Sequence, residues 1–333
     1  MRRVVHFGPA DSPGGMSTVI NTLDRNPPKG WVSGIIATHG QSPIGTISSW
    51  ISAMKKLREV FDNGEIDLAH FHVTHSISWI RKRSLMKKCQ KMGIPSVIHI
   101  HSGKFDRFCS GWFGPSVKKE LLVENRATIV LEERWKDLLK EWIPPSSFVV
   151  SNPSNAVANR ENHRLGDNLE LLLLSRKSGV KGHDFSIRIL EKLHEMGIKA
   201  KLTMTGARFG ASQKFPELEV NCLGWVSEER KRRLVASADF LISPSDYEGS
   251  SMSVIEAIVS GLPAIVSEAS RETIGISELV AGDTPESWAK KIVDCSEPGK
   301  YNQIKEMLRE RSSTYSIEKC RVSLGEIYES LTV

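Results

Sequence analysis

The stretch SDYEGSSMSVIEAIVSGLP, residues 245–263, places two glutamates, Glu248 and Glu256, on the two sides of a Gly-Ser-Ser sequence. The apolar run just before it, Phe240–Ile242, predicts a buried strand. The spacing of apolar residues over Met252–Ser260 predicts a helix that ends at a glycine before a proline. Ligands of open parallel sheets bind at strand-to-helix loops of this kind, at the carboxyl ends of the strands.

The same alternation of short β-rich runs and amphipathic segments extends along the chain in both directions. It predicts an α/β fold with doubly wound parallel sheets and helices on both faces. The strands expected in the first half are Arg3–Phe7, Val32–Ala37, Leu68–Val73, Ser96–His101, Thr128–Leu131 and Phe148–Val150. Those expected in the second half are Glu170–Ser175, Ala200–Thr205, Val220–Leu223, Phe240–Ile242 and Ala264–Val266.

A polar, turn-rich stretch around residue 155 interrupts the alternation, and 333 residues are more than one core usually holds. We therefore expect two Rossmann-like domains, the first over residues 1–155 and the second over residues 156–315. A carboxyl-terminal helix is expected over residues 316–333, and its return to the first domain is left open.

The composition indicates the compartment. The chain is 40% hydrophobic and 25% charged, as globular proteins are, and its five cysteines are scattered without a C-x-x-C pair, which is typical of a reducing compartment. The apolar run in MRRVVHFGPA is too short for a signal peptide, and no run approaches the roughly 18 apolar residues of a membrane span. We expect a cytoplasmic protein.

The net charge of +6 is unevenly distributed. Residues 1–160 hold 22 Lys and Arg against 13 Asp and Glu, and the remaining residues hold 23 against 26. Six basic residues and no acidic one lie between Arg81 and Lys91, which is either a solvated helix face or a surface for an anionic partner. We expect these cations and Trp79 to face outward, toward an anionic membrane surface. No nucleic-acid-binding pattern is present, so nucleic acid is not expected as a partner.

Two features of the first domain could bind a ligand. A glycine pair ending at Gly15 precedes an expected helix, whose free amides favour an anion, although such a pair is more often only a turn. The pairs His70–His72 and His99–His101 each share one face of a strand, which suggests zinc. The sequence places no third ligand with them, so we expect packed, hydrogen-bonded histidines and no metal. His101 opens a loop and is expected to face a cleft between the domains.

In the second domain, a buried strand ends at Ser175 and is followed by Arg176 and, five residues on, by Lys181. Cations beside a loop that leads into a helix suit a diphosphate, because arginine binds two oxygens at once and lysine adds a point charge. Two ordinary surface cations are the alternative. The spacing is not that of a Walker phosphate loop, so nucleotide hydrolysis is not expected.

The loop of the opening stretch combines an acid with free backbone amides. Glu248 is expected to project from it as an exposed carboxylate, while the amides of Gly249–Met252 lie at the start of the helix. A capping interaction between Ser253 and Glu256 would explain the second glutamate in part and the first not at all. A ligand with both hydroxyls and phosphate would satisfy the carboxylates and the amides together, and a nucleotide-sugar is such a ligand.

These elements together resemble the retaining glycosyltransferases of family four. The resemblance rests on the glutamates in the form E-x7-E, on R-x4-K-G at Arg176–Gly182, on LGWVSEERKRRLVASADFLISPS at residues 223–245, and on the early glycine pair. The form EG-x-x-x-SVIEA is similar to that of bacterial capsule and exopolysaccharide enzymes. The resemblance implies the GT-B architecture, two Rossmann-like domains that face a cleft, without a required metal or cofactor. The D-x-D motif of the other main transferase fold is absent.

The resemblance also implies roles for individual residues. Arg176 and Lys181 would hold the donor diphosphate and offset charge on the departing nucleotide. Glu248 would contact hydroxyls of the donor sugar, Glu256 those of the ribose, and His101 would match the family's cleft histidine near the sugar. Further implied contacts are those of Gly15 and of the amides of Gly249, Ser250, Ser251 and Met252 with phosphate, and those of Gly224, Trp225 and Val226 with the nucleobase.

Two departures from the family pattern affect this site. Ser250-Ser251 stands where Phe-Gly is common, and Ser175-Arg176 stands where Gly-Arg is common. Backbone amides survive both changes, so the expected activity is retained.

We therefore expect retaining, metal-independent transfer of a sugar from a UDP- or GDP-sugar to a lipid-linked saccharide, in the synthesis of a cell-surface polysaccharide. A nucleotide-sugar 2-epimerase of the same architecture is one alternative, which the E-x7-E element disfavours. A non-catalytic scaffold that binds sugar nucleotides is another, which the intact Arg176, Lys181, Glu248 and Glu256 disfavour.

Overall fold

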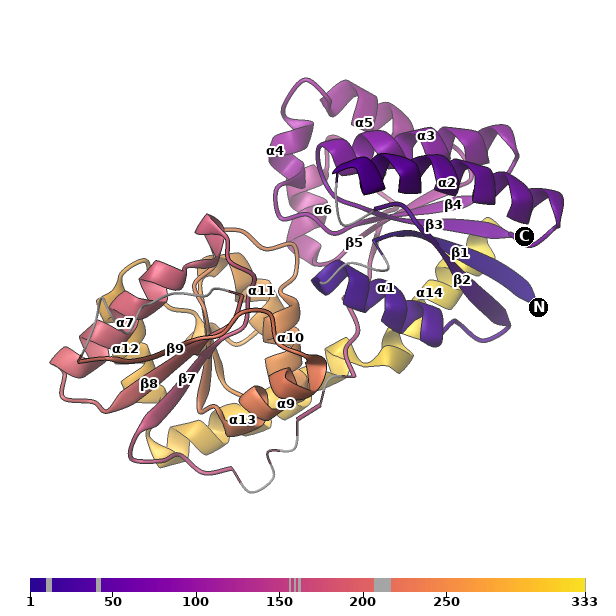
Figure 1. Ribbon diagram of the computed structural model, residues 1–333. Helices are drawn as coiled ribbons and strands as arrows, with labels where there is room; N and C mark the ends of the chain where they lie inside the picture. The colour runs from indigo at the N-terminus through magenta and orange to yellow at the C-terminus, as the bar shows by residue number, and fades with distance from the viewer. Residues whose placement is uncertain are drawn as a thin grey trace. The chain divides into compact units, whose positions relative to one another are not determined.

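The computed structural model describes residues 1–9, 14–39, 43–155, 157–158, 160, 163–206 and 217–332. The chain divides into two compact units. Unit 1 comprises Met1–Pro153 together with Ser316–Val333, and unit 2 comprises Ser154–Tyr315 (Figure 1). Each unit is built around one parallel sheet, as the alternation of strands and helices predicts.

Unit 1 holds a six-stranded sheet. Its strands are β1 (Arg2–Gly8), β2 (Trp31–Ala37), β3 (Leu68–Val73), β4 (Ser96–Ile100), β5 (Arg126–Val130) and β6 (Phe148–Val149). Its helices are α1 (Gly15–Arg25), α2 (Pro43–Asp62), α3 (Ile77–Lys91), α4 (Phe105–Cys109), α5 (Gly114–Leu121), α6 (Glu133–Leu139) and α14 (Ile317–Leu331). The strand order is β2-β1-β3-β4-β5-β6, with α2 and α3 on one face and α1 and α14 on the other (Figure 1).

Helices on both faces leave the central strands of this sheet fully buried. All six residues of β3, LAHFHV, are buried, as are all five of β4, SVIHI. A central strand covered on both sides is usually a continuous apolar run. The histidines in these two strands therefore lie in the interior of unit 1, and their polar atoms must find partners there.

Unit 2 holds a five-stranded parallel sheet in the order β11-β10-β7-β8-β9. The strands are β7 (Leu169–Leu173), β8 (Ala200–Met204), β9 (Glu219–Cys222), β10 (Phe240–Ser243) and β11 (Ala264–Val266). The helices are α7 (His183–Glu195), α9 (Glu228–Ser237), α10 (Met252–Val259), α11 (Arg271–Ile274), α12 (Pro285–Cys295) and α13 (Pro298–Ser312). The apolar run Leu171–Leu173 of β7 is buried at the centre of this sheet, as a central strand requires.

The last helix, α14, belongs to unit 1. The Tyr328 hydroxyl lies 2.6 Å from Nδ1 of His70 in β3, and its ring packs edge-on against Trp31 at 5.1 Å between centroids. Arg321 donates a hydrogen bond to the Pro27 carbonyl at 3.0 Å. Unit 1 is therefore made from two separate segments of the chain.

The expected strands agree with the observed ones to within one or two residues. Two short helices, α4 and α11, were not predicted, because five and four residues are too few to show a helical period. Among the residues described, no helix is both long enough and apolar enough to cross a membrane.

Candidate active site

Two loops meet at the carboxyl-terminal edge of the sheet in unit 2. The loop after β7 reaches the loop after β10, where the amide of Asp246 donates to the Val180 carbonyl at 3.0 Å. Gly182 makes this approach possible, because it has φ of 70° and a Cβ there would lie 2.5 Å from the Pro244 carbonyl oxygen. A side chain at this position would be strained and would also push the two loops apart.

Lys181 and Glu248 form an ion pair across these loops. The ammonium nitrogen lies 2.5 Å from Oε1 of the carboxylate, and the side chains are 20% and 10% exposed. The expectation that Glu248 projects as an exposed acid is therefore wrong, because the neighbouring loop covers it and supplies a cation. The ion pair instead fixes the ammonium and the carboxylate beside each other at the carboxyl ends of the strands.

Glu256 lies in the second turn of α10 and is 5% exposed. It accepts a hydrogen bond from Lys231 of α9 at 2.7 Å, and Lys231 also pairs with Glu228 at 2.8 Å. Burial raises the pKa of Glu256, against the opposing effect of Lys231. Burial would lower the pKa of Lys231, but the carboxylates of Glu256 and Glu228 outweigh it and raise that pKa.

Lys231 was missed from the sequence. It is one of four consecutive basic residues, Arg230–Arg233, on a helix that buries only one residue, Val235. The helical period alone does not distinguish which of the four faces α10. Only the packing of α9 beside the start of α10 identifies it.

The start of α10 is open to an anion. Its N-cap is Ser251, which makes no side-chain cap hydrogen bond, and its first turn has no acidic residue. The proposed capping interaction from Ser253 to Glu256 is wrong, because the N-cap is Ser251, two residues earlier, and the Glu256 carboxylate accepts a hydrogen bond from Lys231. Ser250 Oγ is buried without a hydrogen-bond partner among the described residues. First-turn amides without a cap favour a phosphate oxygen.

Arg176 lies on the same edge, after β7, and is exposed. No salt bridge to it is found among the residues that the structure describes. Gly206, with φ of 77°, packs against it so closely that a Cβ would lie 2.6 Å from the Arg176 Cα. The Gly206 amide also donates to the Gly224 carbonyl at 3.1 Å, which ties the segment Gly224–Val226 to this edge.

Trp225, in that segment, is 62% exposed. An exposed indole at the carboxyl edge offers a flat apolar surface, which is the chemistry that the implied nucleobase contact requires.

His183 supports this edge and was also missed from the sequence. It is 6% exposed, and its Nε2 lies 3.1 Å from the Thr205 carbonyl oxygen and 3.4 Å from Ser175 Oγ. It therefore joins the loops that follow β7 and β8. Its place directly after Lys181-Gly182 is the one signal in the sequence that could have identified it.

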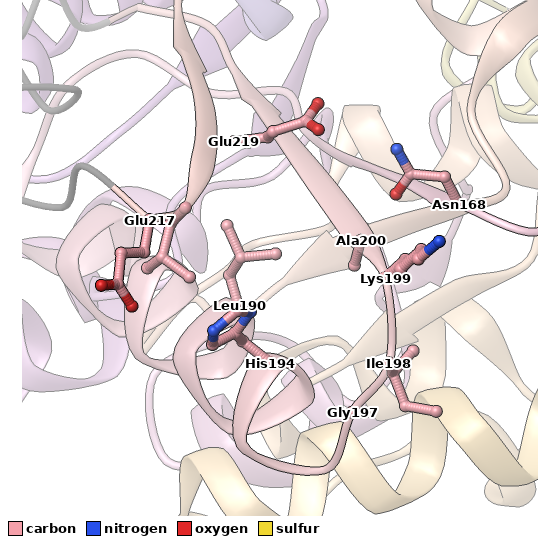
Figure 2. A pocket seen from close by; sticks show the side chains of 10 residues that line it. Asn168, Leu190, His194, Gly197, Ile198, Lys199, Ala200, Glu217 and Glu219 are labelled. Carbon is pink, nitrogen blue, oxygen red and sulfur yellow. The ribbon is translucent and has the colours of Figure 1, made fainter.

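A cavity of about 260 Å³ lies elsewhere in unit 2, at the amino-terminal edge of the same sheet. Figure 2 shows Asn168, Lys199 and Ala200 beside the starts of β7 and β8, with Glu219 at the start of β9. None of the residues predicted for the donor site lines it. The residues predicted for the donor site therefore lie away from this cavity, in the loops at the carboxyl edge.

In unit 1, Gly15 is the first residue of α1, as expected. The N-cap is Gly14, which has no side chain to cap the helix, and the first turn has no acidic residue. This helix start has the features that favour an anion, although residues 10–13 of the same loop lie outside the described residues.

Histidines of β1, β3 and β4 gather on one face of the unit 1 sheet, and His101 follows directly after β4. Nδ1 of His6 lies 3.0 Å from Nε2 of His72, whose Nδ1 lies 2.9 Å from Nε2 of His101. His70 similarly lies 3.2 Å from His99. We call these five residues the histidine cluster. Burial is the main cause that lowers all five pKa values, to about 3 for His6 and His101.

The expectation that the H-x-H pairs lack a third ligand is wrong. His6 joins His70 and His72 in a group whose ring nitrogens lie within 4.8 Å of one another, and His72, His99 and His101 form a second group. Three imidazole nitrogens this close suit a transition metal ion. In the structure, some of the same nitrogens hydrogen-bond to one another.

The basic segment of α3 is exposed only in part: Lys87 and Lys91 are exposed, Arg81, Arg83 and Lys88 are half-buried, and Lys82 is buried. Trp79 and Lys82, expected on the surface, are 0% and 2% exposed. Arg83 and Lys87 lie 2.9 Å and 3.7 Å from the buried Glu120 carboxylate. Lys88 donates a hydrogen bond to the Met54 carbonyl at 2.6 Å. The prediction that all of these cations and Trp79 face outward is therefore wrong for Trp79 and Lys82, which are buried in unit 1, while Lys87 and Lys91 are exposed as predicted.

Solved structures share this fold over nearly the whole chain. Sucrose-phosphate synthase from Thermosynechococcus elongatus aligns with a TM-score of 0.75 at 15% identity, over 99% of each chain. Anabaena HepE in complex with UDP-glucose aligns with a TM-score of 0.76 at 13% identity, over 99% of this chain and 100% of its own. The architecture is therefore the GT-B fold of two parallel-sheet α/β domains, as the resemblance predicted.

The family match lies within unit 2, which carries Glu248 and Glu256. Residues 169–297 match the family described as Glycosyl transferases group 1. The Bacillus subtilis protein EpsF, a glycosyltransferase by name, is 28% identical over 171 residues, which are 47% of this chain and 44% of EpsF. A GDP-mannose-dependent phosphatidylinositol dimannoside mannosyltransferase of Mycobacterium tuberculosis is 29% identical over 118 residues, 34% of this chain and 30% of its own. The chain thus matches less than half the length of these curated relatives.

Proposed function

We propose that this chain is a retaining glycosyltransferase that takes a sugar from a UDP- or GDP-sugar without a metal ion. The observation that carries the proposal is the arrangement around the start of α10. Two carboxylates, Glu248 and Glu256, lie on either side of an uncapped helix start, and each is paired with a lysine. A nucleotide-sugar offers hydroxyls for the carboxylates and phosphates for the lysines and amides.

The comparisons support the donor class. Residues 169–297, which contain all four of these side chains, match the group 1 glycosyl transferases. One relative is named for its dependence on GDP-mannose, and one structural neighbour was solved with UDP-glucose. We therefore assign unit 2 to the nucleotide-sugar donor and unit 1 to the acceptor.

In the proposed reaction, electrostatics and positioning lower the barrier. Arg176 and Lys181 offset the charge that develops on the departing diphosphate, and the dipole of α10 adds to them. Glu248 orients the donor sugar through its hydroxyls, and Glu256 the ribose. The acceptor hydroxyl attacks from the face that the nucleotide leaves, so the anomeric configuration is retained. By the resemblance, we also propose that His101 contacts the transferred sugar.

The acceptor in this proposal is a lipid-linked saccharide in the synthesis of a cell-surface polysaccharide, reached at the inner face of the membrane. Four exposed isoleucines at the starts of α2 and α3 support it: Ile47 and Ile51, each 58% exposed, Ile77, 68% exposed, and Ile80, 49% exposed. Side chains of this kind at the surface bury themselves at a lipid interface.

Flotation with liposomes tests the membrane contact. The double variant Ile77→Ser/Ile80→Ser should bind vesicles that contain anionic lipid at least tenfold more weakly than the parent chain, because each buried isoleucine contributes about 1.5–3 kcal/mol. Val322→Ser is the control, since Val322 is 53% exposed on α14. Equal flotation of all three proteins would count against this surface.

Two other functions remain candidates for the site. A nucleotide-sugar 2-epimerase would release its product without any acceptor, and a scaffold would bind the donor without turnover. Neither the epimerase nor the scaffold needs to bind an acceptor, whereas sugar transfer does.

The deciding experiment is a donor screen with the purified chain. UDP-, GDP- and ADP-sugars are tested for binding, for slow hydrolysis and for transfer to lipid-linked saccharides. We expect one nucleotide to bind clearly best and turnover to rise when acceptor is added. Turnover that is indifferent to acceptor would favour the epimerase, and binding without any turnover would favour the scaffold.

A further inference from the structure

The second turn of α3 holds a buried lysine. Lys82 is 2% exposed, and its ammonium nitrogen donates a hydrogen bond to the Ser78 hydroxyl at 2.9 Å. Among the described residues, no carboxylate forms a salt bridge with it or influences its titration. Burial and then Arg81 lower its pKa to about 7. Burying an ammonium group costs several kcal/mol unless an anion compensates it, so packing alone does not account for this residue.

Lys82 reaches back to the start of its own helix. Ser78 lies in the first turn of α3, one turn before Lys82, which is the direction that helical side chains take. That turn has no acidic residue, and its N-cap Ser76 makes no side-chain cap hydrogen bond. The positive end of the helix dipole therefore adds to the ammonium charge.

A second cation lies next to this helix start. Arg81 is partly exposed, its Nη2 lies 3.4 Å from Nδ1 of His39, and its Nε is buried without a hydrogen-bond partner among the described residues. After burial, the charges of Arg81 and Lys82 further lower the pKa of His39. Lys82 has the same effect on His101. These four residues thus share one region of positive potential.

Exposed apolar side chains lie on α3 and on the neighbouring helix α2. Ile77 and Ile80 of α3 are 68% and 49% exposed, and Ile47 and Ile51 of α2 are each 58% exposed. The two helices pack together, since Trp50 Nε1 of α2 donates to Ser84 Oγ of α3 at 2.9 Å. A partly buried pair of cations is therefore bordered by apolar side chains.

We propose that the start of α3 binds a phosphoryl group of the acceptor, with Arg81 in direct contact and Lys82 supplying buried charge. This inference rests on the proposed function, because it concerns the acceptor of the same reaction. A guanidinium matches phosphate oxygens, and Nε of Arg81 has no hydrogen-bond partner among the described residues. A buried ammonium without a carboxylate partner gains most from a dianion. The phosphoryl group can belong to a lipid or to a soluble sugar phosphate, and the apolar border favours the lipid.

Hydrogen–deuterium exchange of the full chain, read peptide by peptide, tests the site. The probes are inorganic pyrophosphate in solution and vesicles of phosphatidylcholine with or without phosphatidic acid. We expect pyrophosphate to slow exchange over residues 76–84, with an apparent affinity at least tenfold weaker in Arg81→Gln and in Lys82→Met. Lys91→Met is the matched control, since Lys91 lies exposed at the far end of the same helix. Protection by phosphatidic acid vesicles well beyond that by pyrophosphate assigns the phosphoryl group to a lipid, and the reverse assigns it to a soluble acceptor.

Absence of protection at residues 76–84 with both probes would overturn the proposal, as would protection unchanged in both variants. UDP and GDP are run in parallel as a separate arm. Protection of residues 176–182 and 246–256 by one of them supports the donor site and should survive in Arg81→Gln and Lys82→Met. If residues 76–84 are not protected but the donor-site residues are, the phosphoryl site alone is rejected. If no nucleotide protects the donor-site residues, the proposed function is rejected.

Discussion

The two units place charge at the same edge of similar sheets in opposite ways. In unit 2 two lysines at the carboxyl edge are matched by carboxylates, Lys181 by Glu248 and Lys231 by Glu256, while Arg176 is exposed and has no salt bridge among the described residues. In unit 1 the buried histidine cluster is held neutral, and Lys82 has no carboxylate partner among the described residues. The charges of Lys181 and Lys231 in unit 2 are thus compensated before a ligand binds, whereas the charge of Lys82 in unit 1 has no carboxylate partner among the described residues.

This difference teaches what each edge can do. A matched pair fixes the direction of both side chains at little electrostatic cost, so a ligand meets groups that are already in place. An unmatched buried cation destabilises the free protein and gains stability when an anion binds. The comparison predicts that unit 2 depends on its pairs for activity, while unit 1 depends on pH and on ligand for stability.

The largest expected effect is the acid sensitivity of unit 1. His6 and His101 have pKa values of about 3 in the folded chain, below the usual 6.5, so the unfolded chain binds more protons below pH 6.5. Stability is therefore retained above pH 6.5 and lost as the pH falls, by about 1.4 kcal/mol per pH unit for each histidine. Hydrogen exchange at pH 7 and 5, corrected for intrinsic rates, should show β3 losing protection before β10.

The variant His6→Gln is the control for this prediction, because glutamine can hydrogen-bond but does not titrate. It should reduce the pH slope of unfolding in unit 1. Parallel loss of protection in both units, or a slope unchanged in the variant, would contradict the contrast between them.

The next effect concerns the matched pairs. Lys181→Ala and Glu248→Gln should each lower the rate of sugar transfer about a hundredfold, since one charge-assisted contact in the transition state is worth about 3 kcal/mol. Both variants should fold. Lys192→Ala is the control, because Lys192 pairs with Glu195 on an exposed part of α7. Near-normal turnover of both variants in steady-state assays would refute the donor-site assignment.

A smaller effect is expected for substitution of Lys82, and here the substitution should raise the stability of the chain. Lys82→Met should stabilise the chain at pH 7 by on the order of 1–3 kcal/mol, because it removes an uncompensated buried charge. The pKa of about 7 lies below that of the unfolded lysine, so the parent chain gains stability as the pH rises from 7 toward 10.5. Urea denaturation at several pH values should show that gain in the parent and not in the variant.

Arg81, on the same helix, is the charged group that lowers the pKa of Lys82 after burial, and Lys82 in turn lowers the pKa values of His39 and His101 on neighbouring segments. His39 and His101 already have lowered pKa values and contribute little charge above pH 7. Destabilisation by Lys82→Met at every pH would show that the ammonium is compensated in solution.

The smallest expected effect is that of a chelator. We expect turnover to be unchanged in EDTA, because the sequence has no D-x-D motif and the proposed site stabilises the diphosphate with side-chain cations and amides. Activity that is lost in EDTA and restored by manganese or magnesium would contradict the proposal that Arg176 and Lys181 stabilise the diphosphate without a metal ion.

Much of the fold could be predicted from the sequence because buried parallel strands are local apolar runs. The location of Glu256 on a helix followed from the same local pattern. The environment of Glu248 did not, because its partner Lys181 lies 67 residues away and only the meeting of two loops brings them together. The sequence prediction of the histidine cluster missed His6 for the same reason, because His6 is brought to the cluster only by the pairing of β1 with β3.

The orientation of α3 could not be predicted for a different reason. Its apolar residues form no single stripe, so the helical period does not choose a buried face. The buried face includes Trp79, Leu85 and Cys89 together with Lys82. A lysine on that face contradicts the usual rule of charge outside, and departures of this kind are expected at functional sites.

The return of α14 has a consequence for the order in which the protein matures. Unit 2 is one continuous segment, whereas unit 1 needs residues 316–333 to cover His70 and Trp31. Because domains fold as the ribosome releases them, we expect His70 and Trp31 to stay uncovered by α14 until residues 316–331 emerge, after unit 2 is complete. Ribosome stalling anywhere between residues 154 and 315 therefore leaves a nascent chain whose first segment is a target for chaperones and proteases.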